Sequence, residues 1–168
     1  KIKNNKFPDN PYRMTFYCMN HTGYHSLCVL LTKAFLEGQD PYRGQICDEW
    51  LDVPGATDGL IALTGGPKGR LSQLIDTGSE RQAGGIVGRW KKLFPNRLYI
   101  ELQRANRPKD ENQNAFLVTV ASRFDVPVVA THPVQFLEPQ DFEAHEVRCC
   151  IAGGFTITDP RRDKSYTR

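Results

Sequence analysis

The sequence predicts an α/β protein with mainly parallel strands, and two observations support this. First, four short apolar stretches each precede a longer stretch with helical spacing, so strand and helix alternate along the chain. Second, the short stretches are continuous apolar runs, as in parallel strands that are buried on both faces. Two architectures fit this order equally, namely an open doubly wound sheet and part of a β/α barrel.

The predicted strands occupy four stretches rich in aromatic and β-branched residues. In chain order they are RMTFYCM at 13–19, GLIALTGG at 59–66, RLYIELQ at 97–103 and VPVVAT at 126–131. The second stretch ends in two glycines, which allow the backbone to turn tightly. Residues 1–13 are polar and contain prolines, so we expect a loop there.

The predicted helices follow the strands at residues 20–38, 71–95, 109–125 and 138–154. In the first, Leu27, Leu30, Leu31 and Ala34 recur at helical spacing, and Gly38 is the stop signal. Glycines interrupt the second helical stretch and weaken the prediction of one unbroken helix. Residues 39–59 are expected to be a long connection with one helical turn near 47–53.

Composition indicates one soluble domain of an ordinary kind. The chain has 168 residues, of which 39% are hydrophobic and 24% are charged, and its net charge of +3 is too small to indicate nucleic-acid binding by itself. No apolar run approaches the ~20 residues that a membrane helix needs. The first residues lack the apolar core of a secretory signal. Because the chain does not begin with Met, we expect a piece of a longer protein.

The cysteines predict a reducing compartment. There are five, an odd number, and no Cys-x-x-Cys spacing occurs among Cys18, Cys28, Cys47, Cys149 and Cys150. We therefore expect buried or inert thiols rather than disulfides or a cysteine zinc site.

The predicted strand ends offer few chemical groups. Glu101, His132 and His21 are the metal-ligand candidates, and three scattered side chains make a poor hydrolytic centre. No spacing selects a nucleophile with its base, so no catalytic residue is predicted. Lys68 and Arg70 in GGPKGR are candidates for phosphate binding. The stretch lacks the spacing of a phosphate-binding loop, and a tight turn with exposed charge explains it as well.

Longer blocks of the sequence carry a specific resemblance. The blocks NHTGYHSLCVLLTKAFLEGQ, GLIALTGG, FPNRLYIELQRANRPKDENQN and VPVVATHPVQFLEPQDFEAHEVRCCIAGGFTITDPRR resemble the polymerase-and-histidinol-phosphatase (PHP) domains of bacterial DNA polymerase III alpha subunits. The resemblance implies a partial distorted β/α barrel, the later strands of a roughly seven-stranded one. It places a PHP fragment without its first strands at 1–155 and an exit linker at 156–168.

The resemblance also identifies degenerate metal-ligand positions. Metal-binding relatives carry Asn-Asp-x-His at the end of the fourth strand, where this chain has His132, Pro133 and Gln135. They carry a further histidine where this chain has Ala105. Proline has no donor atom and glutamine is a poor ligand for zinc or manganese, so we expect no metal and no cofactor in this fragment.

The resemblance implies a role in DNA replication. The full chain would be a DNA-directed DNA polymerase, a nucleotidyltransferase with Mg²⁺ in a site outside this fragment, in the bacterial cytoplasm. The fragment would be a scaffold that docks the proofreading exonuclease subunit beside other replicase subunits, with DNA contacted through the full chain and no membrane. Tyr42, Trp50 and Phe142 are candidate exposed anchors. The missing strands predict that the isolated fragment dimerises or aggregates.

Two rival functions remain open at this point. One is a metal-dependent PHP phosphoesterase or 3′–5′ exonuclease, completed by the missing N-terminal segment. The other is an independent phosphate-binding domain that uses GGPKGR. In the basic tail, Arg161 and Arg162, with Lys164 and Arg168, are either DNA contacts or part of a solvated linker.

Overall fold

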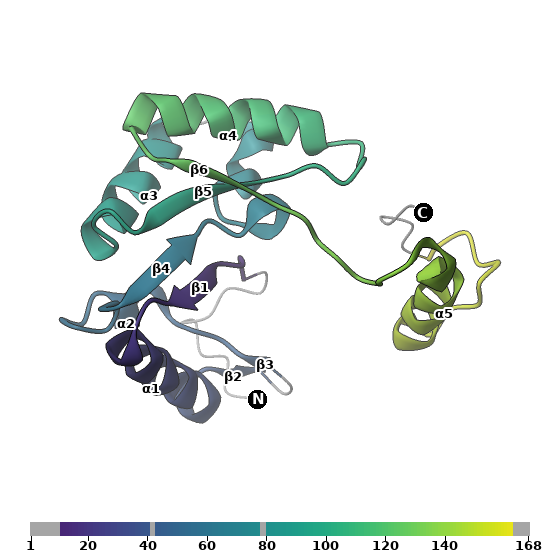
Figure 1. Ribbon diagram of the computed structural model, residues 1–168, viewed down its shortest axis with the longest axis horizontal. Helices are drawn as coiled ribbons and strands as arrows, with labels where there is room; N and C mark the ends of the chain where they lie inside the picture. Colours follow the sequence, from purple (N-terminus) through teal and green to yellow (C-terminus); the bar gives the residue numbers. More distant parts are fainter. Residues whose placement is uncertain (1–10, 41–42, 78–79, 163–168) are drawn as a thin grey trace.

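A four-stranded sheet in the order β1-β4-β5-β6 forms the frame of the protein (Figure 1). The computed structural model describes residues 11–40, 43–77 and 80–162. The strands are β1 (Thr15–Cys18), β4 (Leu60–Leu63), β5 (Leu98–Gln103) and β6 (Val128–Thr131). β4, β5 and β6 are parallel, which confirms the predicted class, whereas β1 runs antiparallel to β4. Hydrophobic pattern carries no information on strand direction, so the sequence did not indicate this reversal.

The α-helices in the described part of the chain are α1 (His21–Glu37), α2 (Asp48–Leu51), α3 (Glu80–Leu93), α4 (Asp110–Phe124) and α5 (Phe142–Gly153). α1 begins where Asn20 accepts a hydrogen bond from the Gly23 amide at 3.0 Å. Gly23 packs directly on the turn before β4, because a Cβ there would lie 2.0 Å from the Gly59 carbonyl oxygen. This close contact requires a glycine at position 23 and fixes α1 against the sheet.

Two connections differ from the sequence expectation. A two-stranded hairpin, β2 (Gln39–Asp40) with β3 (Arg43–Gly44), lies within the predicted long loop. The first part of the predicted helix 71–95 is instead a 3₁₀ helix, η2 (Ser72–Thr77). It follows another short 3₁₀ helix, η1 (Gly66–Lys68), and the Ser72 hydroxyl donates to the Gly66 carbonyl at 2.7 Å. This contact holds a tight turn where helical spacing alone predicted a regular helix.

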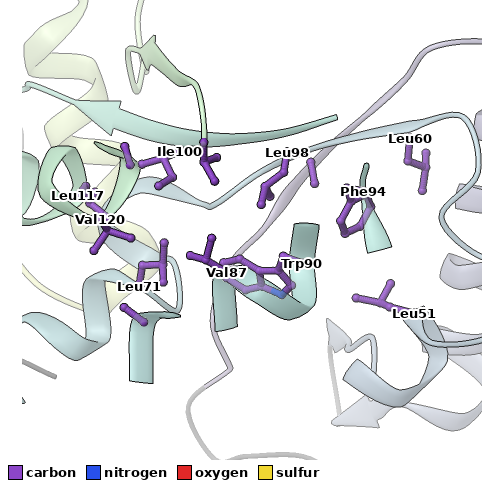
Figure 2. Close-up of a cluster of buried hydrophobic side chains, with 14 of the residues drawn as sticks. Leu51, Leu60, Leu71, Val87, Trp90, Phe94, Leu98, Ile100, Leu117 and Val120 are labelled. Atoms are coloured by element: carbon purple, nitrogen blue, oxygen red, sulfur yellow. The ribbon is translucent and has the colours of Figure 1, made fainter. Parts of the chain in front are cut away.

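The hydrophobic core lies on one face of the sheet. Alternate residues of the two central strands, Leu60 and Ala62 in β4 and Leu98 and Ile100 in β5, are at most 4% exposed. Helices α1 to α4 pack buried side chains into the same cluster, including Leu30 of α1. Figure 2 shows Leu51, Trp90 and Leu117 from these helices, together with Phe94, which directly follows α3. We call this the helix-covered face.

The other face of the sheet carries the remaining alternate residues. Ile61, Leu63 and Tyr99 do not belong to the core cluster, and Tyr17 in β1 is 55% exposed, although Leu63 is only 5% exposed. Toward the carboxyl ends of the strands this face becomes polar, with Glu101, Gln103 and Thr131. We call it the open face. Parallel sheets normally have both faces covered, so the described residues account for only one of the two layers.

The chain leaves the sheet after β6. Figure 1 shows α5 set apart from the sheet at the end of an extended segment, and the short 3₁₀ helix η3 (Pro139–Asp141) leads into it. Residues that follow α5 fold back on it, because the Phe155 amide donates to the Cys150 carbonyl at 2.9 Å and Arg162 pairs with buried Glu146. No helix among the described residues has the length and apolar character to cross a membrane.

Candidate functional site

A pocket of about 610 Å³ opens at the carboxyl ends of β4 and β5, on the open face. In doubly wound and barrel folds, this end of the strands is where function is normally located. Its lining comes from the chain before β1, the start of β1, the turn before η1, η1, β5, the β5–α4 loop, the start of α4 and the loop after β6. These lining residues are Arg13, Thr15, Gly65, Pro67, Lys68, Glu101, Gln103, Arg107, Pro108, Lys109, Asp110, Gln113, Pro133 and Gln135.

Glu101 forms the floor of the pocket and is 5% exposed. Its Oε2 accepts a hydrogen bond from the Gly65 amide at 3.1 Å. Its Oε1 accepts from the Thr131 hydroxyl at 2.6 Å and from the Gln103 side-chain amide at 2.9 Å. Both carboxylate oxygens are therefore held by protein donors, which offset the cost of burying the charge.

Gln103 and Thr131 are themselves held in position. The Gln103 amide nitrogen also approaches the Thr131 hydroxyl oxygen at 3.1 Å, and the Gln103 backbone carbonyl accepts from the Asn114 side chain at 3.0 Å. β5 and β6 are paired in register at Gln103 and Thr131, which places the two side chains beside each other. We call Gly65, Gln103 and Thr131 the Glu101 clamp.

Asp110, at the start of α4, shapes the loop that forms one wall of the pocket. It is 2% exposed, and its Oδ2 accepts from the Ala105 amide at 2.6 Å and from the Arg107 amide at 3.2 Å. These bonds fix the loop between β5 and α4, so the side chains of Arg107 and Lys109 are presented at the pocket.

Some of the candidate metal-ligand positions line the pocket and others do not. Glu101, a candidate from the strand ends, lies at the floor of the pocket, and Pro133 and Gln135, which the resemblance singled out, also line it. Ala105 contributes its backbone amide to Asp110, while His132 and His21 are exposed and do not line the pocket. His21 stacks on Tyr24 at 6.1 Å instead. Across the described residues, no three His, Cys, Asp or Glu side chains are grouped so that they could hold a metal ion.

The wall of the pocket carries four cationic side chains, from Arg13, Lys68, Arg107 and Lys109. Only Lys68 was among the sequence candidates. The other three come from loops that lack any phosphate-binding spacing, so only the folded chain identifies them. We call these four residues the cationic rim.

The remaining basic candidates have other partners. Arg70 lies over the Tyr12 ring at 5.9 Å, outside the pocket. Arg161 pairs with Asp159, and this hydrogen-bonded partner lowers the pKa of the Asp159 carboxyl. Arg162 pairs with buried Glu146. Lys164 and Arg168 lie outside the described residues, as do residues 1–10.

Tyr12 fixes the segment that carries Arg13. Its ring packs beside Trp90 at 6.2 Å and its hydroxyl donates to the Asp48 carboxylate. Burial, and then the Asp48 carboxylate, raise the pKa of Tyr12 well above its ordinary value. The next residue continues the attachment, because the Arg13 amide donates to the Lys68 carbonyl at 2.8 Å.

The predicted exposed anchors are not borne out as a group. Trp50 is 6% exposed and belongs to the core cluster, with Lys33 over its ring at 4.8 Å, so its assignment as an exposed anchor was wrong. Phe142 is half-buried against Phe136, with ring centroids 5.8 Å apart. Tyr42 lies outside the described residues. The five cysteines are free thiols, but only Cys47 and Cys150 are buried as expected, whereas Cys18 is exposed.

Comparison with known proteins gives a consistent result. The PHP domain family matches residues 2–105. The chain is 39% identical over 164 residues to the DNA polymerase III subunit alpha of Pseudomonas fluorescens. The matched region covers 97% of this chain and 14% of that relative. It is 39% identical over 155 residues to the same subunit of Pseudomonas aeruginosa, and this match covers 92% of this chain and 13% of the relative. It is 36% identical over 166 residues to that of Vibrio cholerae, covering 99% and 14%.

These relatives are much longer than this chain, which spans about a seventh of their length. The similarity nonetheless extends over nearly the whole of the present sequence, including the β5–α4 loop and the segment after β6.

Proposed function

The chain belongs to the PHP domain family, and on this basis we propose that it is part of a replicative DNA polymerase subunit in which it acts as a metal-free scaffold. The long relatives are DNA polymerase III alpha subunits, and the similarity covers nearly all of this chain. The parent chain would carry out DNA-directed nucleotide transfer with Mg²⁺ at a site elsewhere in its sequence, in the bacterial cytoplasm.

We place a partial barrel at residues 1–155 and the exit toward the polymerase part at 156–168. Helices cover one face of the sheet, as on the outside of a β/α barrel, while the open face corresponds to the barrel interior. In the described part of the chain, β1 and β6 each pair with only one strand. Further strands would pair with these edges. Without them, the isolated chain should dimerise or aggregate, which light scattering at high concentration would detect.

The Glu101 clamp is the observation that carries the metal-free proposal. A carboxylate that binds a metal ion must direct an oxygen lone pair at it, and of the about four lone-pair positions of Glu101, Gly65, Gln103 and Thr131 take three, two on Oε1 and one on Oε2. The same pocket is lined by Pro133, whose side chain has no donor atom, and by Gln135, whose amide binds transition metals poorly. The residues present do not fit the metal centre of the metal-binding relatives.

A scaffold without hydrolytic chemistry acts through binding. We assign to this domain the docking of the proofreading exonuclease subunit, beside the other replicase subunits. The rigid sheet, the ordered β5–α4 loop and the separate α5 segment supply surfaces that the core does not use.

The test uses the full-length parent protein. It should form a stoichiometric complex with the proofreading exonuclease subunit in size-exclusion chromatography, and it should not hydrolyse a phosphodiester in Mn²⁺ or Zn²⁺. Hydrolysis that disappears in Glu101→Gln but persists in Glu111→Gln, an exposed carboxylate of α4, would establish the rival phosphoesterase function. Failure to bind the exonuclease subunit would remove the docking role.

A further inference from the structure

The pocket presents positive charge to solvent although two carboxylates line it. Glu101 and Asp110 are 5% and 2% exposed, and each accepts hydrogen bonds from the surrounding protein. The cationic rim of Arg13, Lys68, Arg107 and Lys109 faces the same cavity, and Arg13, Lys68 and Lys109 are exposed residues. The surface that a ligand meets is therefore cationic, and the negative charge lies beneath it.

From this charge distribution we propose that the cationic rim docks an acidic peptide segment of a partner protein. The proposal rests on the scaffold function above and specifies the chemistry of one segment that the scaffold binds. Charge complementarity supports it, since complementary charges across an interface steer encounter and fix the register of the partner.

The arrangement of the rim favours a peptide over a compact anion. The cations come from three separate segments, because Arg13 precedes β1, Lys68 lies in η1, and Arg107 and Lys109 lie in the β5–α4 loop. The floor at Glu101 repels a compact, multiply charged anion that would sit deep in the pocket. Spaced carboxylates on an extended chain reach the rim and avoid the floor.

The apolar part of the lining fits the same occupant. Pro67, Pro108 and Pro133 line the pocket between the cations. Proline rings are rigid apolar surfaces that lack a backbone donor, so they suit the apolar side chains of a peptide and offer nothing to a phosphate. A peptide that alternates acidic and apolar residues satisfies both parts of the wall.

The binding experiment uses the full-length parent protein and a defined probe. A fluorescein-labelled peptide that alternates glutamate with leucine or alanine is titrated, and anisotropy is read at low and at high salt. We expect saturable binding that weakens as salt rises, because the contacts are between exposed charges. A lysine-for-glutamate version of the peptide should not bind.

Charge reversal locates the site. The double variant Arg13→Glu/Lys68→Glu should bind the acidic peptide at least about tenfold more weakly. A matched double variant, Arg81→Glu/Lys92→Glu, reverses two exposed cations of α3 outside the pocket and should bind within about twofold of the native protein. The milder Lys68→Ala, which should weaken binding in the same direction, guards against misfolding of the double variant.

Three outcomes would overturn the inference. The peptide could fail to bind, or bind equally to the rim variant and the α3 variant. Alternatively, inorganic phosphate or a short single-stranded oligonucleotide could displace the peptide and bind the rim more tightly, which would make the pocket a phosphate site. If the exonuclease subunit still binds a rim variant that has lost the peptide, the scaffold function survives and a different surface holds that subunit. If the native protein binds the peptide but not the exonuclease subunit, the peptide site survives and the docking role fails.

Discussion

The two faces of the sheet differ in what their side chains do. On the helix-covered face, Leu60, Ala62 and Ile100 are fully buried in one continuous core. On the open face, Tyr17 is 55% exposed, and the strands end in the hydrogen-bonded group around Glu101. The first face accounts for the stability of the fold. The second carries the pocket, and we propose that the domain interacts with its partners through this face.

The largest expected effect comes from removing one aromatic side chain from each face. Phe94→Ala empties a fully buried position of the helix-covered core and should cost about 3–5 kcal/mol in the free energy of unfolding. Tyr17→Ala on the open face should change it by less than about 0.5 kcal/mol. Urea unfolding of both variants measures the difference. Equal losses would mean that the open face is already packed against other residues.

A smaller effect should follow from opening the Glu101 clamp. Thr131→Val removes the hydroxyl that donates to Glu101 at 2.6 Å and should lower the free energy of unfolding by about 1–3 kcal/mol. Thr119→Val is the matched control, because that exposed hydroxyl bonds only to the Ala115 carbonyl of its own helix, and it should stay within about 0.5 kcal/mol. A neutral Thr131→Val would show that the clamp does not hold the carboxylate.

The smallest effect concerns Tyr12, which ties the Arg13 segment to Asp48. Because its pKa is raised in the folded state, the stability that Tyr12 contributes is fully present below the ordinary pKa of 10.0 and is lost as pH rises through the raised value. Tyr12→Phe should cost about 1 kcal/mol at neutral pH through loss of the hydrogen bond. Above pH 10.0 its stability should fall less steeply than that of the native chain. Parallel pH profiles would contradict this assignment.

Much of the fold could be read from local pattern. The helix predicted at 109–125 is α4 (Asp110–Phe124), and the strand predicted at 97–103 is β5 (Leu98–Gln103). What failed was non-local. The antiparallel direction of β1 depends on its pairing with β4, and the η2 turn depends on the Ser72 bond to Gly66. The two-residue strands β2 and β3 are too short to produce a periodicity.

The site was also predictable only where local sequence pattern determines it. Strand ends pointed to Glu101, because carboxyl ends of parallel strands converge, but also to His132 and His21, which lie outside the pocket. Pro133 and Gln135 were singled out only by the resemblance. Nothing in the sequence connected them to Thr131 as a donor, to Asp110 as the residue that orders the β5–α4 loop, or to Arg13 and Arg107. These residues meet only through strand register and loop closure.

The proposed scaffold function requires that no metal ion binds beside Glu101. Elemental analysis of the full-length parent protein, purified without chelator and dialysed against zinc and manganese, tests this directly. The Glu101 clamp predicts less than stoichiometric metal, with no difference between the native protein and Glu101→Gln. One tightly bound equivalent of zinc or manganese that is lost in Glu101→Gln would contradict the metal-free proposal and favour the metal-dependent phosphoesterase function.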